Sequence, residues 1–219
     1  MRVPIALAAI TVVAAAVALL SGCDSGSGGG ASSDKIQGVG SASAPPSTPA
    51  TAFPAPTDSA GRPTITFPSY AKNVFEDQYT GDPAKDAVLA DNERWVDSMD
   101  DAIFRGTAST KELAFYSTGR GTELAVAYVQ GYIAKGDKWA GSTRFFARKV
   151  SLLGGDTASV VYCSDESQSH ITNPKKPTKH TPTSPDSYVL YNTHLTLNAQ
   201  GVWQTDNVVS DRGARQCRP

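Results

Sequence analysis

The sequence from Asp82 to Gly106, DPAKDAVLADNERWVDSMDDAIFRG, predicts a long amphipathic helix. Asp82 is a suitable N-cap, Pro83 fits the first helical position, and Gly106 ends the helix. Apolar residues recur at helical spacing and form one face: Val88, Trp95, Val96, Met99, Ile103 and Phe104. The opposite face is expected to lie in solvent and carries Asp91, Arg94, Asp97 and Asp101.

Two further helices are expected after Gly106. The capping-box pattern Ser109-Thr110-Lys111-Glu112 predicts a shorter helix that runs through Tyr116. A third helix is expected to open at Thr122 and to close near Gly136. It has two apolar stripes, so we expect it to be largely buried. The stripes contain Leu124, Ala127, Tyr128 and Tyr132, and Val126, Val129 and Ile133.

After Gly141 the hydrophobic period changes from helical to alternating, which predicts β-strands. Four strands are expected, over residues 143–153, 158–164, 188–198 and 202–209. The polar stretch 165–185 is expected to be a loop, and 68–80 to wrap the surface with a helical turn at Val74-Phe75. On the third strand one face carries Val189, Tyr191, Thr193, Leu195 and Leu197. Three helices followed by four antiparallel strands predict an α+β domain with its sheet packed on the helices.

The N-terminus has the pattern of an export signal. Arg2 precedes an uncharged apolar run from Val3 to Leu20. The run leads into Leu20-Ser21-Gly22-Cys23, which resembles a bacterial lipobox, where cleavage before the cysteine is coupled to its acylation. We therefore expect residues 1–22 to be a signal peptide and the acylated Cys23 to anchor the protein on the extracytoplasmic face of the cell membrane. An uncleaved signal anchor and ordinary secretion are the alternatives.

Composition separates a linker from a folded domain. Residues 23–67 hold Cys23 and a stretch rich in Gly, Ser, Ala, Pro and Thr, which has too little apolar surface to fold and is predicted to be a disordered tether. Residues 68–219 are enough for one domain with a real core. The net charge of −1 gives no basis for a nucleic-acid partner, which would need a basic face.

The cysteine count agrees with an extracytoplasmic location. If Cys23 is acylated, Cys163 and Cys217 remain, and an even pair in an oxidising compartment predicts a disulfide. This bond would hold the C-terminal tail against a strand. The alternative is a buried free thiol together with an exposed reactive one.

The order of elements resembles the cystatin-like α+β cone of nuclear transport factor two, ketosteroid isomerase and scytalone dehydratase. The chain also resembles a family of short actinobacterial envelope lipoproteins of unassigned function. That resemblance covers roughly residues 70–219 and rests on Thr80-Gly81-Asp82-Pro83, Tyr116-Ser117-Thr118-Gly119, Val161-Tyr162-Cys163-Ser164-Asp165, Gly201-Val202-Trp203 and Cys217. It implies the fold and an envelope location, and it carries over no catalytic residue.

Cone folds often form a pocket between the long helix and the sheet. The residues expected to line such a pocket are Tyr116, Tyr128, Tyr132 and Tyr191, with ordinary core packing as the alternative. Asp100 and Asp101 are weighed as a general base, but a solvated helix face is favoured for both. Trp95, Trp139 and Trp203 are expected to pack in the core or at its edge.

Other charged groups offer weaker candidates. Lys175, Lys176 and Lys179 form a local basic cluster that could contact an anionic envelope polymer or lipid headgroups, with a solvated loop as the alternative. A metal site from Asp165, Glu166, His170 and His180 is considered, but the spacing matches no known pattern, so no metal and no cofactor are expected.

The function expected from the sequence is a non-enzymatic binding or interaction module at the cell envelope, with a membrane anchor and an envelope polymer or protein as partner. One rival is a small-molecule carrier that uses the cone pocket, and another is an isomerase- or cyclase-like enzyme. A closed, apolar-filled interior would exclude both rivals. A cavity with an inward carboxylate beside a tyrosine would favour the enzyme.

Overall fold

The computed structural model describes residues 61–219, except for residues 179 and 181. The predicted signal peptide, Cys23 and the linker as far as residue 60 lie outside the described residues and stay predictions. Within the described part, no helix is long and apolar enough to cross a membrane.

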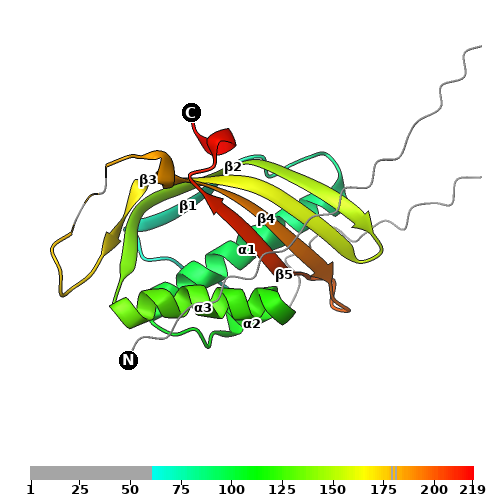
Figure 1. The fold of residues 1–219 in the computed structure, drawn as a ribbon. Helices are drawn as coiled ribbons and strands as arrows, with labels where there is room; N and C mark the ends of the chain where they lie inside the picture. Colours follow the sequence, from blue (N-terminus) through cyan, green and yellow to red (C-terminus); the bar gives the residue numbers. More distant parts are fainter. Residues whose placement is uncertain (1–60, 179, 181) are drawn as a thin grey trace, which may run out of the picture. The chain divides into compact units, whose positions relative to one another are not determined.

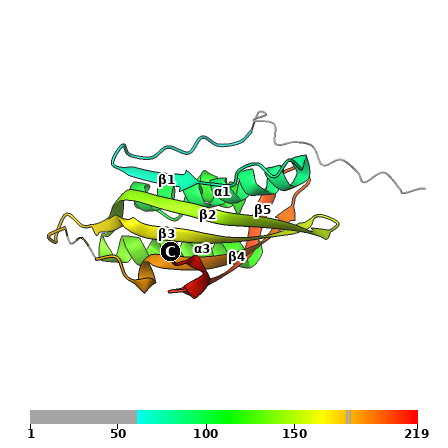
Figure 2. The ribbon, with the colours of Figure 1, turned by 90° about the horizontal axis from the view of Figure 1, so that it is seen from above.

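The described residues form an α+β domain in which a curved, five-stranded sheet is covered on one face by three helices (Figures 1 and 2). The strands are β1 (Ala71–Phe75), β2 (Lys138–Gly154), β3 (Thr157–Thr172), β4 (Tyr188–Leu197) and β5 (Trp203–Arg212). They lie in the order β1-β2-β3-β4-β5, and the helices are α1 (Pro83–Arg105), α2 (Lys111–Tyr116) and α3 (Gly119–Lys135).

The sheet has one strand more than predicted, and it is mixed rather than antiparallel. The segment expected to wrap the surface with a helical turn contains β1, which pairs in parallel with β2 and sets Phe75 opposite Phe145. The two rings stack with their centroids 4.7 Å apart. A five-residue strand has too short an alternation to be recognised, and its pairing depends on a partner far along the chain.

The prediction of a polar loop over residues 165–185 was also partly wrong. Residues 165–172 continue β3 and pair with the beginning of β2, which starts at Lys138 instead of residue 143. Polar side chains in this part of the sheet find partners of their own, as Asp165 does with Arg144 at 3.5 Å. The extension therefore forms although only its last two residues, Ile171 and Thr172, are of the β-branched type that marks a strand in sequence.

The predicted bounds of α1 are confirmed, and its caps are local. The Ala84 N–H donates to the Asp82 side chain at 3.0 Å, and Gly106 has the left-handed backbone that ends the helix. The predicted solvated face was wrong at Asp91, which is fully buried. Its carboxylate forms ion pairs with Arg62 and Arg94 and accepts the Trp203 backbone N–H at 2.9 Å.

The expectation that α3 is largely buried was wrong. Only Gly121, Ala125 and Val129 are buried, while Tyr128 and Ile133 are exposed. Gly121 marks the closest approach of α3 to the sheet, since a Cβ added there would lie 2.1 Å from the Thr205 carbonyl oxygen. The helix thus packs tightly along one line, with Val126 and Tyr132 only partly buried against the core.

The outer face of the sheet holds a second, small cluster. The predicted disulfide between Cys163 and Cys217 is present, with a Cα–Cα distance of 5.5 Å. It packs with Tyr188 and Ala214, and it holds the short 3-10 turn Arg215–Cys217 against the sheet on the side away from the helices (Figure 2).

Candidate functional site

The space between the helices and the sheet is hollow. A cavity of about 570 Å³ lies between α1, α3 and the inner face of β2 to β5, and the exposed side chains of Tyr128 and Ile171 lie at its border. Its walls are mostly aromatic and aliphatic. They include Trp95, Val96, Met99, Leu124, Tyr128, Tyr132, Trp139, Phe145, Tyr162, Val189, Tyr191 and Val208.

Three carboxyl groups line the cavity, those of Asp100, Glu166 and Asp186, and of these only Asp100 is buried. Asp100 of α1 is only 9% exposed and lines the cavity. Its two oxygens accept one hydrogen bond each, from Trp139 Nε1 of β2 at 3.0 Å and from Asn73 Nδ2 of β1 at 2.8 Å. The prediction of a solvated face was therefore wrong for Asp100. Asp101 is also buried, but it bonds Arg105 at 3.0 Å and does not line the cavity.

The environment of Asp100 favours its protonated form more than water does. Burial raises the pKa of Asp100 to about 7; the hydrogen bonds from Asn73 and Trp139 oppose the rise, and the charge of Glu166 adds to it. The pKa of Asp97 is likewise raised to about 7, first by burial, although Asn73 Nδ2 also donates to it at 2.9 Å. Asn73 thus joins two acidic side chains of α1 to the edge strand.

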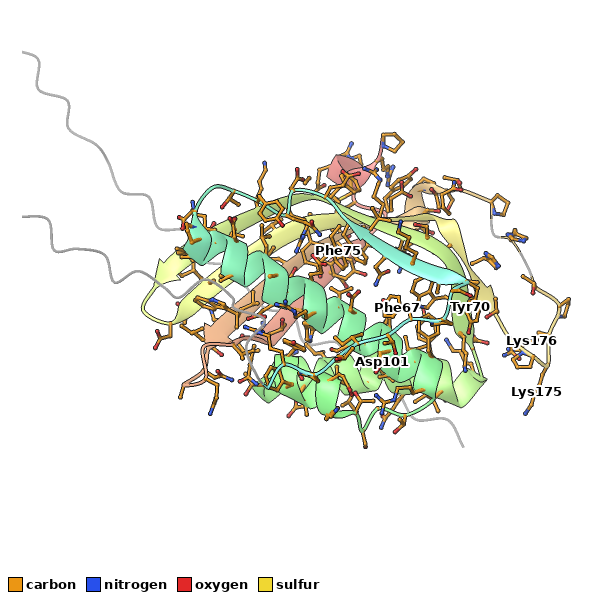
Figure 3. All side chains as sticks on the ribbon, turned by 180° about the vertical axis from the view of Figure 1, so that it is seen from behind. Phe67, Tyr70, Phe75, Asp101, Lys175 and Lys176 are labelled. Carbon is orange, nitrogen blue, oxygen red and sulfur yellow. A yellow bond between two sulfur atoms is a disulfide. The ribbon has the colours of Figure 1, made fainter. Side chains whose placement is uncertain are left out.

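Aromatic rings hold Trp139 in place. Phe104 lies 5.2 Å from Trp139 between ring centroids, and Phe67 contacts both rings at 5.5 and 6.2 Å. Tyr70 contacts Phe104 from the outside at 6.1 Å. Figure 3 shows Phe67 and Tyr70 together at the C-terminal end of α1. This packing fixes the indole N–H that orients Asp100.

Three of the four tyrosines predicted for a pocket meet in the cavity. Tyr128 and Tyr132 of α3 have their hydroxyls 3.4 Å apart, and Tyr191 of β4 stacks on Tyr162 at 5.1 Å. Desolvation raises the pKa of each of these side chains, including that of Tyr128, which is half exposed. Their role in binding stays a prediction.

Tyr116 does not line the cavity. It is fully buried in α2, and its hydroxyl lies beside Arg62. The structure thus separates it from the other three tyrosines. Trp203 is likewise a core residue, whereas Trp95 and Trp139 line the cavity.

Two charged side chains, Glu166 and Arg212, form part of the cavity wall. Arg212 of β5 donates to the Glu166 carboxylate of β3 at 2.8 and 3.2 Å and to the Asp186 carbonyl at 2.7 Å. His170 also lines the cavity, and its ring lies 4.2 Å from that of His180. No group of side chains in the described residues has the arrangement of a metal site, and Glu166 is engaged by Arg212.

The predicted basic cluster lies outside the cavity. Lys175 and Lys176 stand on the loop after β3 (Figure 3), which lies beside the C-terminal end of α3, since Asn173 Nδ2 donates to the Lys135 carbonyl at 2.9 Å. Lys176 Nζ is 3.8 Å from Asp137 and remains mostly exposed. Lys179 lies outside the described residues. Contact of this loop with an anionic surface stays a prediction.

Sequence reasoning missed Asn73 and Arg212, considered Glu166 only as a metal ligand, and undervalued Asp100. Asp100 lies four residues after Val96 and three before Ile103, so helical spacing alone places it beside the apolar face. An acidic residue inside an apolar stripe was the available signal. No comparable signal marks the other three, because their positions depend on strand pairing between distant segments.

A comparison with protein-family models finds no match, and a comparison with curated proteins finds none either. Solved structures similar to this chain include a ketosteroid isomerase-like protein from Erwinia carotovora atroseptica, at 12% identity and a TM-score of 0.40 over 61% of this chain and 98% of that one. A cystatin-like domain of unknown function from Nostoc punctiforme matches at 18% identity and a TM-score of 0.35, over 56% and 77% of the chains. An NTF-2 like protein of unknown function from Shewanella oneidensis matches at 14% identity and a TM-score of 0.33, over 55% of this chain and 96% of that one.

Replacing Asp100 with Asn should change how stability depends on pH. The raised pKa, about 7 against the usual 3.8, means that the folded protein binds this proton more tightly than the unfolded chain. The stabilisation is complete below about pH 4 and is lost as the pH rises to 7. Asn does not titrate, so the Tm of Asp100→Asn relative to wild type should rise by about 3 °C or more between pH 5 and 8.

Thermal unfolding followed by circular dichroism measures this difference, and any constant cost of the substitution cancels in it. The control is Asp211→Asn, the same exchange at an exposed position, which should run parallel to wild type. Parallel curves for Asp100→Asn and wild type would show that Asp100 is not buried as described.

Proposed function

We propose that this protein binds a small organic molecule in its cavity while a lipid on Cys23 holds it at the extracytoplasmic face of the cell membrane. The observation that carries the binding role is the hollow interior, with aromatic walls and one buried carboxyl group. Ligand sites in proteins are concave, mostly apolar and provided with a few oriented polar groups. The cavity volume of about 570 Å³ is in the range of such sites.

The carrier is preferred to the interaction module expected from the sequence. A module that binds only through its surface has no need of a hollow core, and filling the cavity with larger side chains would add packing energy. The inward positions are instead occupied by polar or adaptable groups such as Asp100, Tyr132 and Tyr191. An envelope polymer or protein partner stays a proposal, with the loop of Lys175 and Lys176 as its contact.

An isomerase- or cyclase-like enzyme is the second candidate. The observation that favours it is Asp100, whose pKa of about 7 suits a group that takes and returns a proton near neutral pH. The hydroxyls of Tyr128 and Tyr132 border the same cavity and could donate a hydrogen bond to a developing oxyanion. Conversion of the bound molecule, against its recovery unchanged, separates the enzyme from the carrier.

The envelope location is supported by the lipobox-like motif and by the disulfide. A bond between Cys163 and Cys217 is typical of proteins that work outside the cytoplasm. A tether between Cys23 and the domain would leave the cavity free to exchange its ligand away from the membrane surface.

Native mass spectrometry of the full-length protein, purified from its own membrane, tests the binding role. We expect a small molecule to co-purify with wild type and to be lost in Val208→Trp, because Val208 lines the cavity and an indole would fill it. Val209→Trp is the matched control, since Val209 is adjacent on β5, is 65% exposed and does not line the cavity. Bare wild-type protein, or full occupancy of Val208→Trp, would contradict the proposal.

Cys23→Ser tests the anchor. The substitution removes the thiol that would be acylated, so we expect loss of lipid labelling and either release of the domain or accumulation of the uncleaved precursor. Metabolic labelling with an alkyne fatty acid and cell fractionation measure both effects. Labelling equal to wild type would refute acylation at Cys23.

A further inference from the structure

The charges that line the cavity are unbalanced. If the cavity binds a small molecule, as proposed above, this imbalance indicates the chemical class of that ligand. Among the described residues that line the cavity, Asp100, Glu166 and Asp186 carry carboxylates, while Arg212 is the one guanidinium and no lysine is present. Arg212 is already engaged by Glu166 through two hydrogen bonds. In the described part of the chain, Asp100 therefore has no cationic partner.

Around Asp100 the donors of Asn73 and Trp139 are already used, and hydrogen-bond acceptors remain. Asn73 Nδ2 lies between carboxylate oxygens of Asp97 and Asp100, so this atom is the amide donor. The Asn73 Oδ1 acceptor is buried and has no hydrogen-bond partner among the described residues. Each Asp100 oxygen accepts one hydrogen bond and keeps further capacity. A ligand group that supplies several donors would satisfy these atoms.

The walls beside Asp100 are aromatic. Trp139 donates to Asp100, and Tyr128 and Tyr132 are near enough for the Asp100 charge to raise their pKa values. Tyr191 faces the same space from β4. Aromatic faces attract organic cations, and the attraction grows when the cation leaves water.

We propose that the cavity binds an organic cation, an amine with an apolar body, whose ammonium group lies against Asp100 while its body packs among the aromatic rings. An ammonium group has three donors and no acceptor, which matches the acceptors around Asp100. Its positive charge supplies the partner that Asp100 lacks. An anionic ligand would meet an excess of carboxylates.

This binding has a definite pH dependence. The ammonium requires ionised Asp100, whose pKa in the empty protein is about 7, so affinity should rise between pH 5.5 and 8 and approach a limiting tenfold per pH unit at the acid end. Other titratable or charged groups lie next to Asp100 or line the same cavity. They are Asp97 of α1, Tyr128 and Tyr132 of α3, Tyr162, Glu166 and His170 of β3, Asp186 before β4, Tyr191 of β4 and Arg212 of β5.

The test compares three probes of nearly equal shape: 1-naphthylmethylamine, 1-naphthalenemethanol and 1-naphthoic acid. At pH 8 the amine is mostly positively charged, the alcohol is uncharged and the acid is negatively charged. Binding to the full-length protein in lipid nanodiscs is measured by calorimetry, with empty nanodiscs as the blank. We expect the amine to bind about tenfold or more tighter than the alcohol, and the acid to bind most weakly.

Asp100→Asn should remove the preference for the amine and leave the affinity for the alcohol within about threefold of wild type. The alcohol thereby reports that the variant is folded with its cavity intact. Asp101→Asn, the same exchange at the neighbouring residue outside the cavity, should retain the preference. The same measurement on Val208→Trp, which should bind none of the three probes, assigns the binding signal to the cavity.

The outcomes separate this inference from the proposed function. Equal or tighter binding of the alcohol or the acid, lost in Val208→Trp, overturns the cationic ligand and keeps a small-molecule site. A preference for the amine that survives in Asp100→Asn also overturns it. Failure of all three probes to bind contradicts both the ligand class and the proposed binding role.

Discussion

The two hydrogen bonds that Asp100 accepts hold the site together. Its carboxyl group belongs to α1, and its donors are Asn73 of the edge strand β1 and Trp139 at the start of β2. A buried carboxyl group is costly unless it is hydrogen-bonded, so these donors are what permit it in an apolar cavity. They also fix the end of α1 against the parallel edge of the sheet. Without β1 one of the two donors, Asn73, would be missing, and Trp139 alone would bond the inward-facing carboxyl group.

The hollow follows from how the helices meet the sheet. Gly121 lets α3 approach β5 closely at one end, while Tyr128 and Tyr132 lie further along the helix and border the open space. The cavity wall has an aromatic part and a charged part. Aromatic rings around Trp139 pack beside Asp100, and the ion pair of Glu166 and Arg212 forms the charged part, close enough for the Glu166 charge to raise the pKa of Asp100. The disulfide on the outer face stiffens the same β3 without touching the interior.

Local signals were enough for part of this fold. The caps Asp82 and Gly106 gave the bounds of α1, and the alternation of β4 correctly assigned the inner face that contains Thr193 and Leu195. The even pair of cysteines that remains once Cys23 is set aside correctly predicted the disulfide. The two failures in the sheet share one cause, which is pairing between distant segments: β1 is too short to recognise alone, and the end of β3 is too polar. The general rule that places acids in solvent then failed at Asp100, because its two donors come from a strand that was not expected and from a strand start that was misplaced.

The central claim is that the interior of the domain holds a carboxyl group kept from water, and a direct measurement is a titration of Asp100 by carbon-13 NMR. The Asp side chains are labelled at the carboxyl carbon, and the Asp100 resonance is identified by its loss in Asp100→Asn. The structure predicts a midpoint near pH 7 in the protein freed of ligand. A midpoint at about 4, the value of an aspartate in water, would contradict the buried site and the cavity chemistry built on it.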